Sequence, residues 1–228
     1  KTKNIFVQIV LSFLVNKNIN IVQFDLLFIA PVIVVSIFSL VFSEILFRKN
    51  IKIIPLSDSF FVFSSFLFLT LLSIGIGIHT VAKTLTYFTK DIKEKESRLF
   101  KVLRFFHLPV GHALPFVNSV LLIFLISLFE INHPLAKPYV ISPVCLVLTG
   151  VLLGLIYVIS VKIYSFIIRY FLLGIIFSVI EIWLILNYDI TLRTHPYFLL
   201  TSSALISSSV FFILDFLRVK ILSAIKRK

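Results

Sequence analysis

Long apolar runs alternate with short polar segments along the chain, and the length of these runs is its most informative feature. A helix needs about 20 consecutive apolar residues to cross a bilayer. The longest run is divided near its middle by Lys162 and Arg169, so it is read as two spans. We therefore predict an all-α fold, a polytopic bundle of six transmembrane helices forming a single domain over residues 1–228. The predicted spans are residues 24–47, 59–82, 109–130, 139–161, 166–187 and 197–217.

The N-terminal segment differs from these runs. Residues 5–15 are apolar but too short to cross a membrane, and lysine and asparagine residues flank them on both sides. No cleavage site of small residues follows, so the segment does not match a signal peptide. A short helix lying in the membrane interface is the structure that this pattern favours.

Composition supports a membrane protein. Hydrophobic residues make up 59% of the 228-residue chain and charged residues 14%, whereas a soluble domain has about 45–50% apolar and about 25% charged residues. The net charge of +12 is explained by basic loops at the cytoplasmic membrane face, so the lipid bilayer and not nucleic acid is the predicted partner. Cys145, the single cysteine, excludes a disulfide within the chain and a multi-thiolate metal site.

The distribution of basic residues predicts the orientation of the bundle. With six spans, 17 of the 22 lysine and arginine residues fall on the side that holds both chain ends, and 5 fall on the other side. Because basic loops remain in the cytoplasm, we expect both termini to be cytoplasmic.

Three histidines near the predicted inner ends of the second and third spans form the candidate site. His79 and His112 lie at the same depth on helices that a short hairpin connects. His107 is five residues from His112, and on a regular helix that separation places the two about 140° apart. If the third helix begins at Pro109, where a missing N–H costs nothing, His107 can fold over its first turn. Three imidazoles and an open position form a catalytic zinc arrangement.

The sequence gives less evidence for a function of the other ionisable residues in or near the predicted spans. Asp215 lies near the inner end of the last span, so it is the candidate catalytic base or a second neighbour of the metal, unless it pairs with Arg218 on its own helix. Glu181 lies near the outer end of the fifth span and is expected to be either a group at the membrane interface or one that forms a hydrogen bond between helices. His133 and His195 each precede a proline in outer loops, where we expect solvated side chains.

The motif G-x-G-I-H-x-x-A at residues 75–82 resembles a group of multi-pass prokaryotic membrane proteins without assigned activity. More distantly, it is similar to the alkaline ceramidases and adiponectin-receptor-like hydrolases. That resemblance implies zinc held by histidines inside a prokaryotic plasma membrane and a lipid amide or ester as substrate. It covers only about residues 75–112. Those hydrolases have seven spans and a His-x-x-x-His pair in a late helix, and Gly75 stands where they have a serine.

Four functions remain open from the sequence. The first is a zinc-dependent lipid hydrolase with His79, His107 and His112 as metal ligands. The second is a haem protein in which His79 and His112 are axial ligands. The third is a proton-coupled transporter with histidines as relay groups. In the fourth, a structural or assembly subunit, the histidines only form hydrogen bonds between helices.

Overall fold

The structure is a computed structural model that describes residues 21–88, 98–163 and 168–225. All regular structure in these ranges is helical, which confirms the all-α prediction. The interfacial helix predicted at residues 5–15 lies outside the described residues. The elements are α2 (Ile21–Leu46), α3 (Asp58–Phe88), α4 (Arg98–Phe105), η1 (Phe106–Val110), α5 (Gly111–Asn132), α6 (Pro143–Ile163), α7 (Ile168–Asn187), η3 (Leu192–Thr194) and α8 (Pro196–Ile225).

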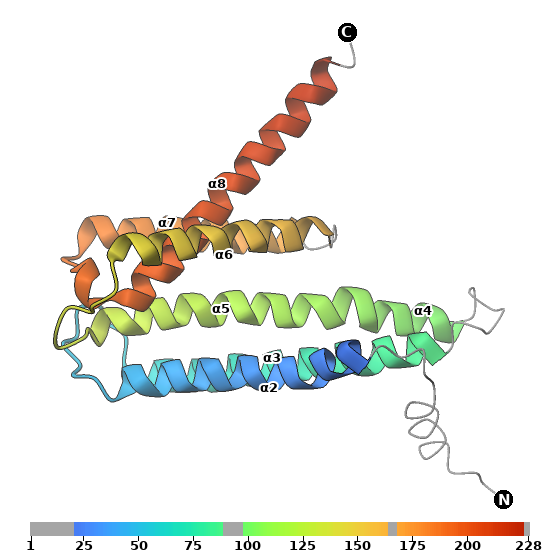
Figure 1. The fold of residues 1–228 in the computed structure, drawn as a ribbon, viewed down its shortest axis with the longest axis horizontal. Helices are drawn as coiled ribbons and strands as arrows, with labels where there is room; N and C mark the ends of the chain where they lie inside the picture. The colour runs from blue at the N-terminus through green and yellow to red at the C-terminus, as the bar shows by residue number, and fades with distance from the viewer. Residues whose placement is uncertain (1–20, 89–97, 164–167, 226–228) are drawn as a thin grey trace, which may run out of the picture.

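The long helices form two groups (Figure 1). In the first, α3 packs along α5 and beside α2; in the second, α6 packs along α8 and beside α7. Contacts of α5 with α7 and α8 join the groups. The C-terminal part of α8 projects out of the bundle, away from α3 and α5 (Figure 1).

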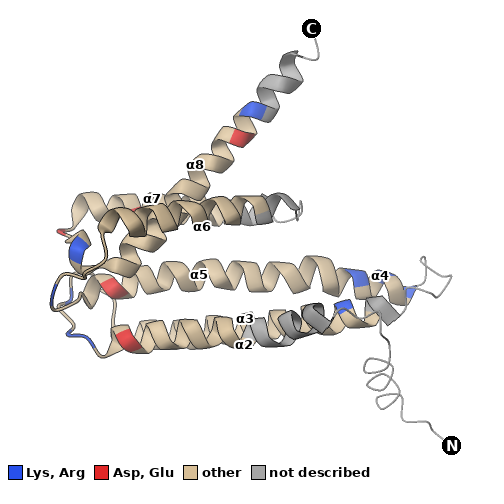
Figure 2. Cartoon of the chain, viewed as in Figure 1, with Lys and Arg blue, Asp and Glu red and all other residues tan. Residues whose placement is uncertain are grey.

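Three of the described helices are long and apolar enough to cross a membrane. They are Asp58–Leu85, Arg98–Asn132 and Pro196–Arg218, and the shorter apolar stretches are Val32–Leu46, Pro143–Ile159 and Leu172–Asn187. Charged residues lie mainly toward the helix ends, with largely uncharged helix between them (Figure 2). This is the distribution that the bilayer interior requires, because ionisable side chains are costly there.

One predicted boundary is wrong. The third helix does not begin at Pro109 but runs continuously from Arg98 through α4, η1 and α5, so part of the predicted charged loop is helical. The last predicted span, residues 197–217, agrees with the membrane-length stretch Pro196–Arg218, and the helix continues beyond it to Ile225. Charged residues marked the expected span ends, but charge does not prevent a helix from continuing into water, since its backbone hydrogen bonds remain internal.

Two glycines allow α6 to lie directly against α8. A Cβ placed on Gly150 would lie 2.6 Å from the Leu200 carbonyl oxygen, and one on Gly154 would lie 2.5 Å from that of Ala204. The facing residues on α8 are also small, chiefly serine and alanine. Small residues are what permits close backbone approach between apolar helices. The G-x-x-x-G spacing therefore specifies this helix pair.

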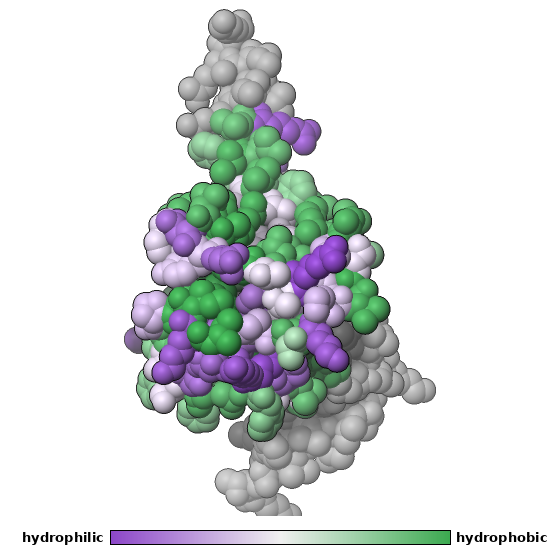
Figure 3. Space-filling view, turned by 90° about the vertical axis from the view of Figure 1, so that its left-hand side faces the viewer, coloured by the Kyte–Doolittle hydropathy of each residue, from purple (hydrophilic) through white to green (hydrophobic). Residues whose placement is uncertain are grey.

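The loops at residues 47–57, 133–142 and 188–195 meet at one end of the bundle, called here the loop end, where hydrophilic residues gather between hydrophobic flanks (Figure 3). Its centre is an ion pair. Arg48 Nη1 donates to Glu130 Oε1 at 2.7 Å, and Arg48 Nη2 donates to Glu44 Oε2 at 2.6 Å. Glu130 Oε2 also accepts the Phe198 N–H at 2.7 Å, which caps the start of α8. The carboxylates raise the pKa of Arg48 against the opposing effect of its burial.

The histidines of the loop end are buried and not solvated, so that expectation was wrong for both. His133 Nδ1 is 3.1 Å from the Phe129 carbonyl oxygen, and its Nε2 is 3.5 Å from Asp58 Oδ1. His195 Nδ1 is 2.8 Å from the Thr191 carbonyl oxygen, and burial lowers the pKa of this ring. The sequence predicted solvent-exposed side chains because both histidines precede prolines in polar segments. In the folded protein the loops pack over each other and bury them.

The ion pair leads to a stability prediction. Arg48→Ala leaves the carboxyl of Glu130, which is 0% exposed, without its cation, and removing one partner of a buried pair costs about 3–5 kcal/mol. Glu44→Gln removes a partner whose side chain is 47% exposed, for which about 1 kcal/mol or less is expected. Thermal unfolding of both variants in detergent measures the difference. Equal melting temperatures would contradict the assigned role of Glu130.

Candidate metal-binding site

The structure brings His79, His107 and His112 together. The ring centroids of His79 and His112 are 4.3 Å apart, those of His79 and His107 are 4.9 Å apart, and those of His107 and His112 are 5.7 Å apart. One ligand atom from each ring lies within 4.8 Å of the other two. Among the described residues, this is the cluster whose geometry could hold a metal ion.

A π-helical turn explains how two histidines of one helix converge. The turn is η1, in which the Gly111 N–H donates to the Phe106 carbonyl oxygen, a bond that spans five residues instead of four. Positions five apart therefore lie nearly above one another, as His107 and His112 do. Pro109 lies inside the turn and has no N–H to give to a regular helix. The sequence prediction of convergence was right, but its mechanism, a loop entering the helix, was wrong.

Close contact between α3 and α5 brings His79 to the other two rings. A Cβ placed on Gly111 would lie 2.8 Å from His79 Cα, and one on Gly75 would lie 2.6 Å from Pro115 Cδ. Only glycine fits at these two points, because any side chain would push the helices apart. Gly77, the other glycine of the motif, has nothing within 4 Å of an added Cβ and does not set the spacing.

The surroundings of the three imidazole rings are more typical of a ligand-binding site than of a hydrogen-bond network in which every polar atom has a partner. Each of the three histidines is partly buried. Nδ1 of His79 is buried without a hydrogen-bond partner, which leaves this nitrogen open to a metal ion or another ligand. The positive charge of Lys83, four residues from His79, acts on all three rings.

Asp215 is not part of the cluster. It lies on the C-terminal part of α8, which projects away from α3 and α5 (Figure 1), and the metal-competent group of the described residues contains the three histidines without it. Equal predicted depth suggested that Asp215 would be close, but depth along a helix does not determine on which side of a bundle that helix lies.

An apolar groove lies beside the histidines. It has a volume of about 440 Å³, and α3 and α4 provide its walls together with Phe106 of η1. Its lining residues are Ile74, Gly77, Ile78, Val81, Ala82, Leu85, Leu103 and Phe106. Ile78 and Phe106, which line the groove, are the chain neighbours of His79 and His107, although the histidines are not themselves among the lining residues.

Glu181 is buried far from this cluster, as the sequence predicted, and is hydrogen-bonded to Ser127 on α5. The structure also buries Glu130, which the sequence analysis did not single out, and His195, which it expected to be solvated. The burial of Glu130 could have been predicted from the sequence, because Arg48 and Glu130 lie at the ends of different spans and can form an ion pair there.

Comparison with known proteins adds no functional assignment. No protein-family model matches the chain, and no similar curated protein or solved structure was found.

Proposed function

We propose that this chain is a polytopic membrane protein that binds one zinc ion through His79, His107 and His112 and hydrolyses a lipid ester or amide. The observation that carries the proposal is the convergence of three ring nitrogens within 4.8 Å of one another. Three histidines leave a fourth position of a tetrahedral zinc ion open. When bound there, zinc would lower the pKa of a coordinated water to about 7 and polarise a carbonyl.

The residues around the site have distinct roles in this proposal. The π-turn holds His107 and His112 on one face, and the α3–α5 contact at Gly111 sets the position of His79. Lys83 provides positive charge that would stabilise an oxyanion as it develops during acyl transfer. Asp215 has no part in this site, since its segment lies elsewhere.

The groove beside the histidines supports a lipid as the substrate class. Its walls are aliphatic and aromatic, so an acyl chain would bury apolar surface there, which contributes about 0.8 kcal/mol for each CH₂ group. The scissile carbonyl at the end of the chain would then lie at the histidines. The missing side chain of Gly77 provides part of this space.

The alternative haem assignment is disfavoured by ring contact. A porphyrin must lie between its two axial imidazoles, whereas the rings of His79 and His112 touch edge to face with centroids 4.3 Å apart. Direct contact of this kind suits ligands that share the same side of one metal ion.

The membrane setting of the proposal comprises six spans with both termini in the cytoplasm. Two observations support it: the 17-to-5 distribution of basic residues, and the grouping of three connecting loops at one end (Figure 1). Reporter fusions after Lys137 and after Lys228 should therefore report opposite sides of the membrane. The same side for both would contradict the six-span topology.

Metal content tests the site directly. Purified wild-type protein should contain about one zinc per chain, and His112→Ala should remove it, because two histidines alone leave too few ligands. Asp215→Asn is the matched control and should retain zinc. Protons compete with zinc for neutral imidazoles, so zinc occupancy should fall as the pH is lowered into the acidic range. Elemental analysis across pH measures this, and zinc that persists in His112→Ala would refute the site.

The groove makes a separate prediction about chain length. Gly77→Leu should fill the groove without disturbing the fold, because nothing lies within 4 Å of a Cβ at this position. Hydrolysis of a long-chain lipid should fall about tenfold or more, which corresponds to losing a few methylene contacts. Zinc content and hydrolysis of a short-chain ester should remain unchanged. Equal loss on both substrates would show that the groove does not hold the acyl chain.

A further inference from the structure

Among the described residues, Glu181 on α7 is a fully buried carboxyl that no basic side chain balances. Its side chain is 0% exposed and lies where α7 meets α5 and α8. The described residues form salt bridges at Glu44, Glu130 and Asp58 but not at Glu181. An ionised carboxyl in such a position is costly unless a cation or several hydrogen bonds compensate it.

The hydrogen bonds around Glu181 indicate which form it takes. Ser127 Oγ lies 2.7 Å from the Phe124 carbonyl oxygen and 2.8 Å from Glu181 Oε1. A serine hydroxyl has one hydrogen, so it cannot make two strong donor bonds at these distances. The conflict disappears when Glu181 is a carboxylic acid: its O–H donates to Ser127 Oγ, and Ser127 donates to Phe124. The geometry therefore favours a protonated side chain.

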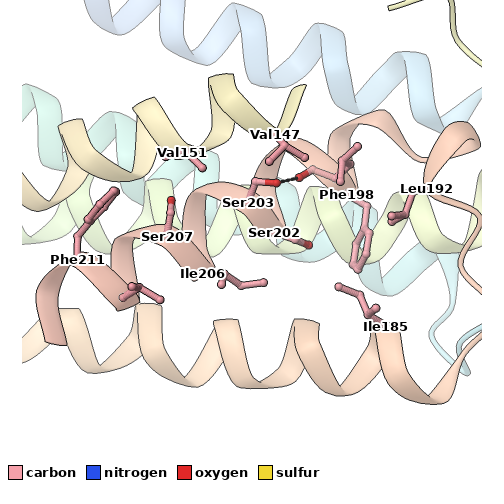
Figure 4. A pocket seen from close by; sticks show the side chains of 12 residues that line it. Val147, Val151, Ile185, Leu192, Phe198, Ser202, Ser203, Ile206, Ser207 and Phe211 are labelled. Carbon is pink, nitrogen blue, oxygen red and sulfur yellow. Dashed lines mark hydrogen bonds between the residues drawn. The ribbon is translucent and has the colours of Figure 1, made fainter. Parts of the chain in front are cut away.

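The second oxygen of the Glu181 carboxyl has no hydrogen bond that fixes its protonation state. Glu181 Oε2 has no hydrogen-bond partner, and neither does Oγ of Ser202 on α8, although this hydroxyl lies near enough to act on the carboxyl. Ser202 is 3% exposed and lines a cavity of about 400 Å³ between α6, α7 and α8. Figure 4 shows Ser202 among the apolar side chains of this cavity. Its hydroxyl thus lies between the carboxyl and the cavity.

From these contacts we propose that Glu181 is a proton-binding site, protonated at rest, which exchanges its proton with water that enters the cavity. The carboxyl proton rotates to Oε2 and passes to Ser202 Oγ, while Ser202 releases its own hydroxyl proton to that water. Reversible protonation of a carboxyl inside a membrane protein is the chemistry that links proton movement to transport or conformational change. The proposal assumes the membrane setting described above, and it does not depend on the zinc site.

The groups that face Glu181 are compatible with this role. From α5 it faces Ser127, and Glu130 lies one turn farther on, held by Arg48. From α8 it faces Ser202. The titratable group of α6 among the packed side chains is Tyr157, whose ring stacks on Phe116 and whose hydroxyl has no partner. None of these groups brings a positive charge to Glu181.

Dicyclohexylcarbodiimide, an apolar reagent for protonated carboxyls, tests the proposal on the full chain in phospholipid vesicles. The acid proton moves to one nitrogen of the carbodiimide, and the carboxylate oxygen adds to its central carbon. Migration of the acyl group from oxygen to nitrogen then gives a stable adduct that retains the whole reagent. Peptide mass spectrometry locates the adduct. We expect it at Glu181, while Glu130, whose two oxygens accept hydrogen bonds from Arg48 and the Phe198 N–H, provides an internal control that is labelled less.

Variants and an infrared measurement complete the test. Ser202→Leu, which blocks the passage, should reduce labelling of Glu181 about tenfold. The infrared band of a protonated carboxyl should be present at neutral pH, decrease reversibly at alkaline pH, and be absent from Glu181→Gln. An unlabelled Glu181, equal labelling of Glu130, or a band that never responds to pH would each overturn the proposal. His112→Ala should retain labelling and Glu181→Gln should retain zinc, so the failure of one site is distinguishable from that of the other.

Discussion

The contact between Gly111 and His79 is the constraint on which the candidate site depends. A Cβ at residue 111 would come within 2.8 Å of both His79 Cα and the Phe106 carbonyl oxygen. The Phe106 carbonyl is also the acceptor of the π-turn bond from Gly111. One glycine therefore permits both the close approach of α3 to α5 and the turn that aligns His107 with His112. Loss of that contact would separate the rings, whatever their ability to bind metal.

The two buried carboxyls of the described bundle, Glu130 and Glu181, have different surroundings. At the loop end, Glu130 accepts hydrogen bonds from Arg48 and from the Phe198 N–H in the first turn of α8. These bonds connect α5, the loop after α2 and α8. Glu181 has a single hydroxyl partner and an unpartnered oxygen. The first arrangement stabilises one geometry, because removing either partner leaves a buried charge. The arrangement around Glu181 leaves its carboxyl free to gain or lose a proton. For this reason we assign a function to Glu181 and not to Glu130.

Much of the helix arrangement could be read from the chain. Apolar runs of bilayer length located every long helix, and the chemistry of the histidines identified the residues that the fold brings together. The glycines of α6 also carried a readable signal, since their G-x-x-x-G spacing matches the contact with α8. Helix ends were less predictable, because the charged residues that mark a membrane boundary do not stop a helix, as the start of the third long helix at Arg98 shows.

By itself, the sequence determined the helical class and the positions of His79, His107 and His112 along their helices, since both follow from local hydrophobicity and helix rise. Only the tertiary structure decided which side of the bundle each residue occupies. Asp215 shares the predicted depth of the histidines but lies on a segment that leaves the bundle. His133 and His195, which precede prolines in polar loops, became buried because three loops pack over one another. Lateral position depends on contacts between segments distant in the chain, and no local pattern encodes them.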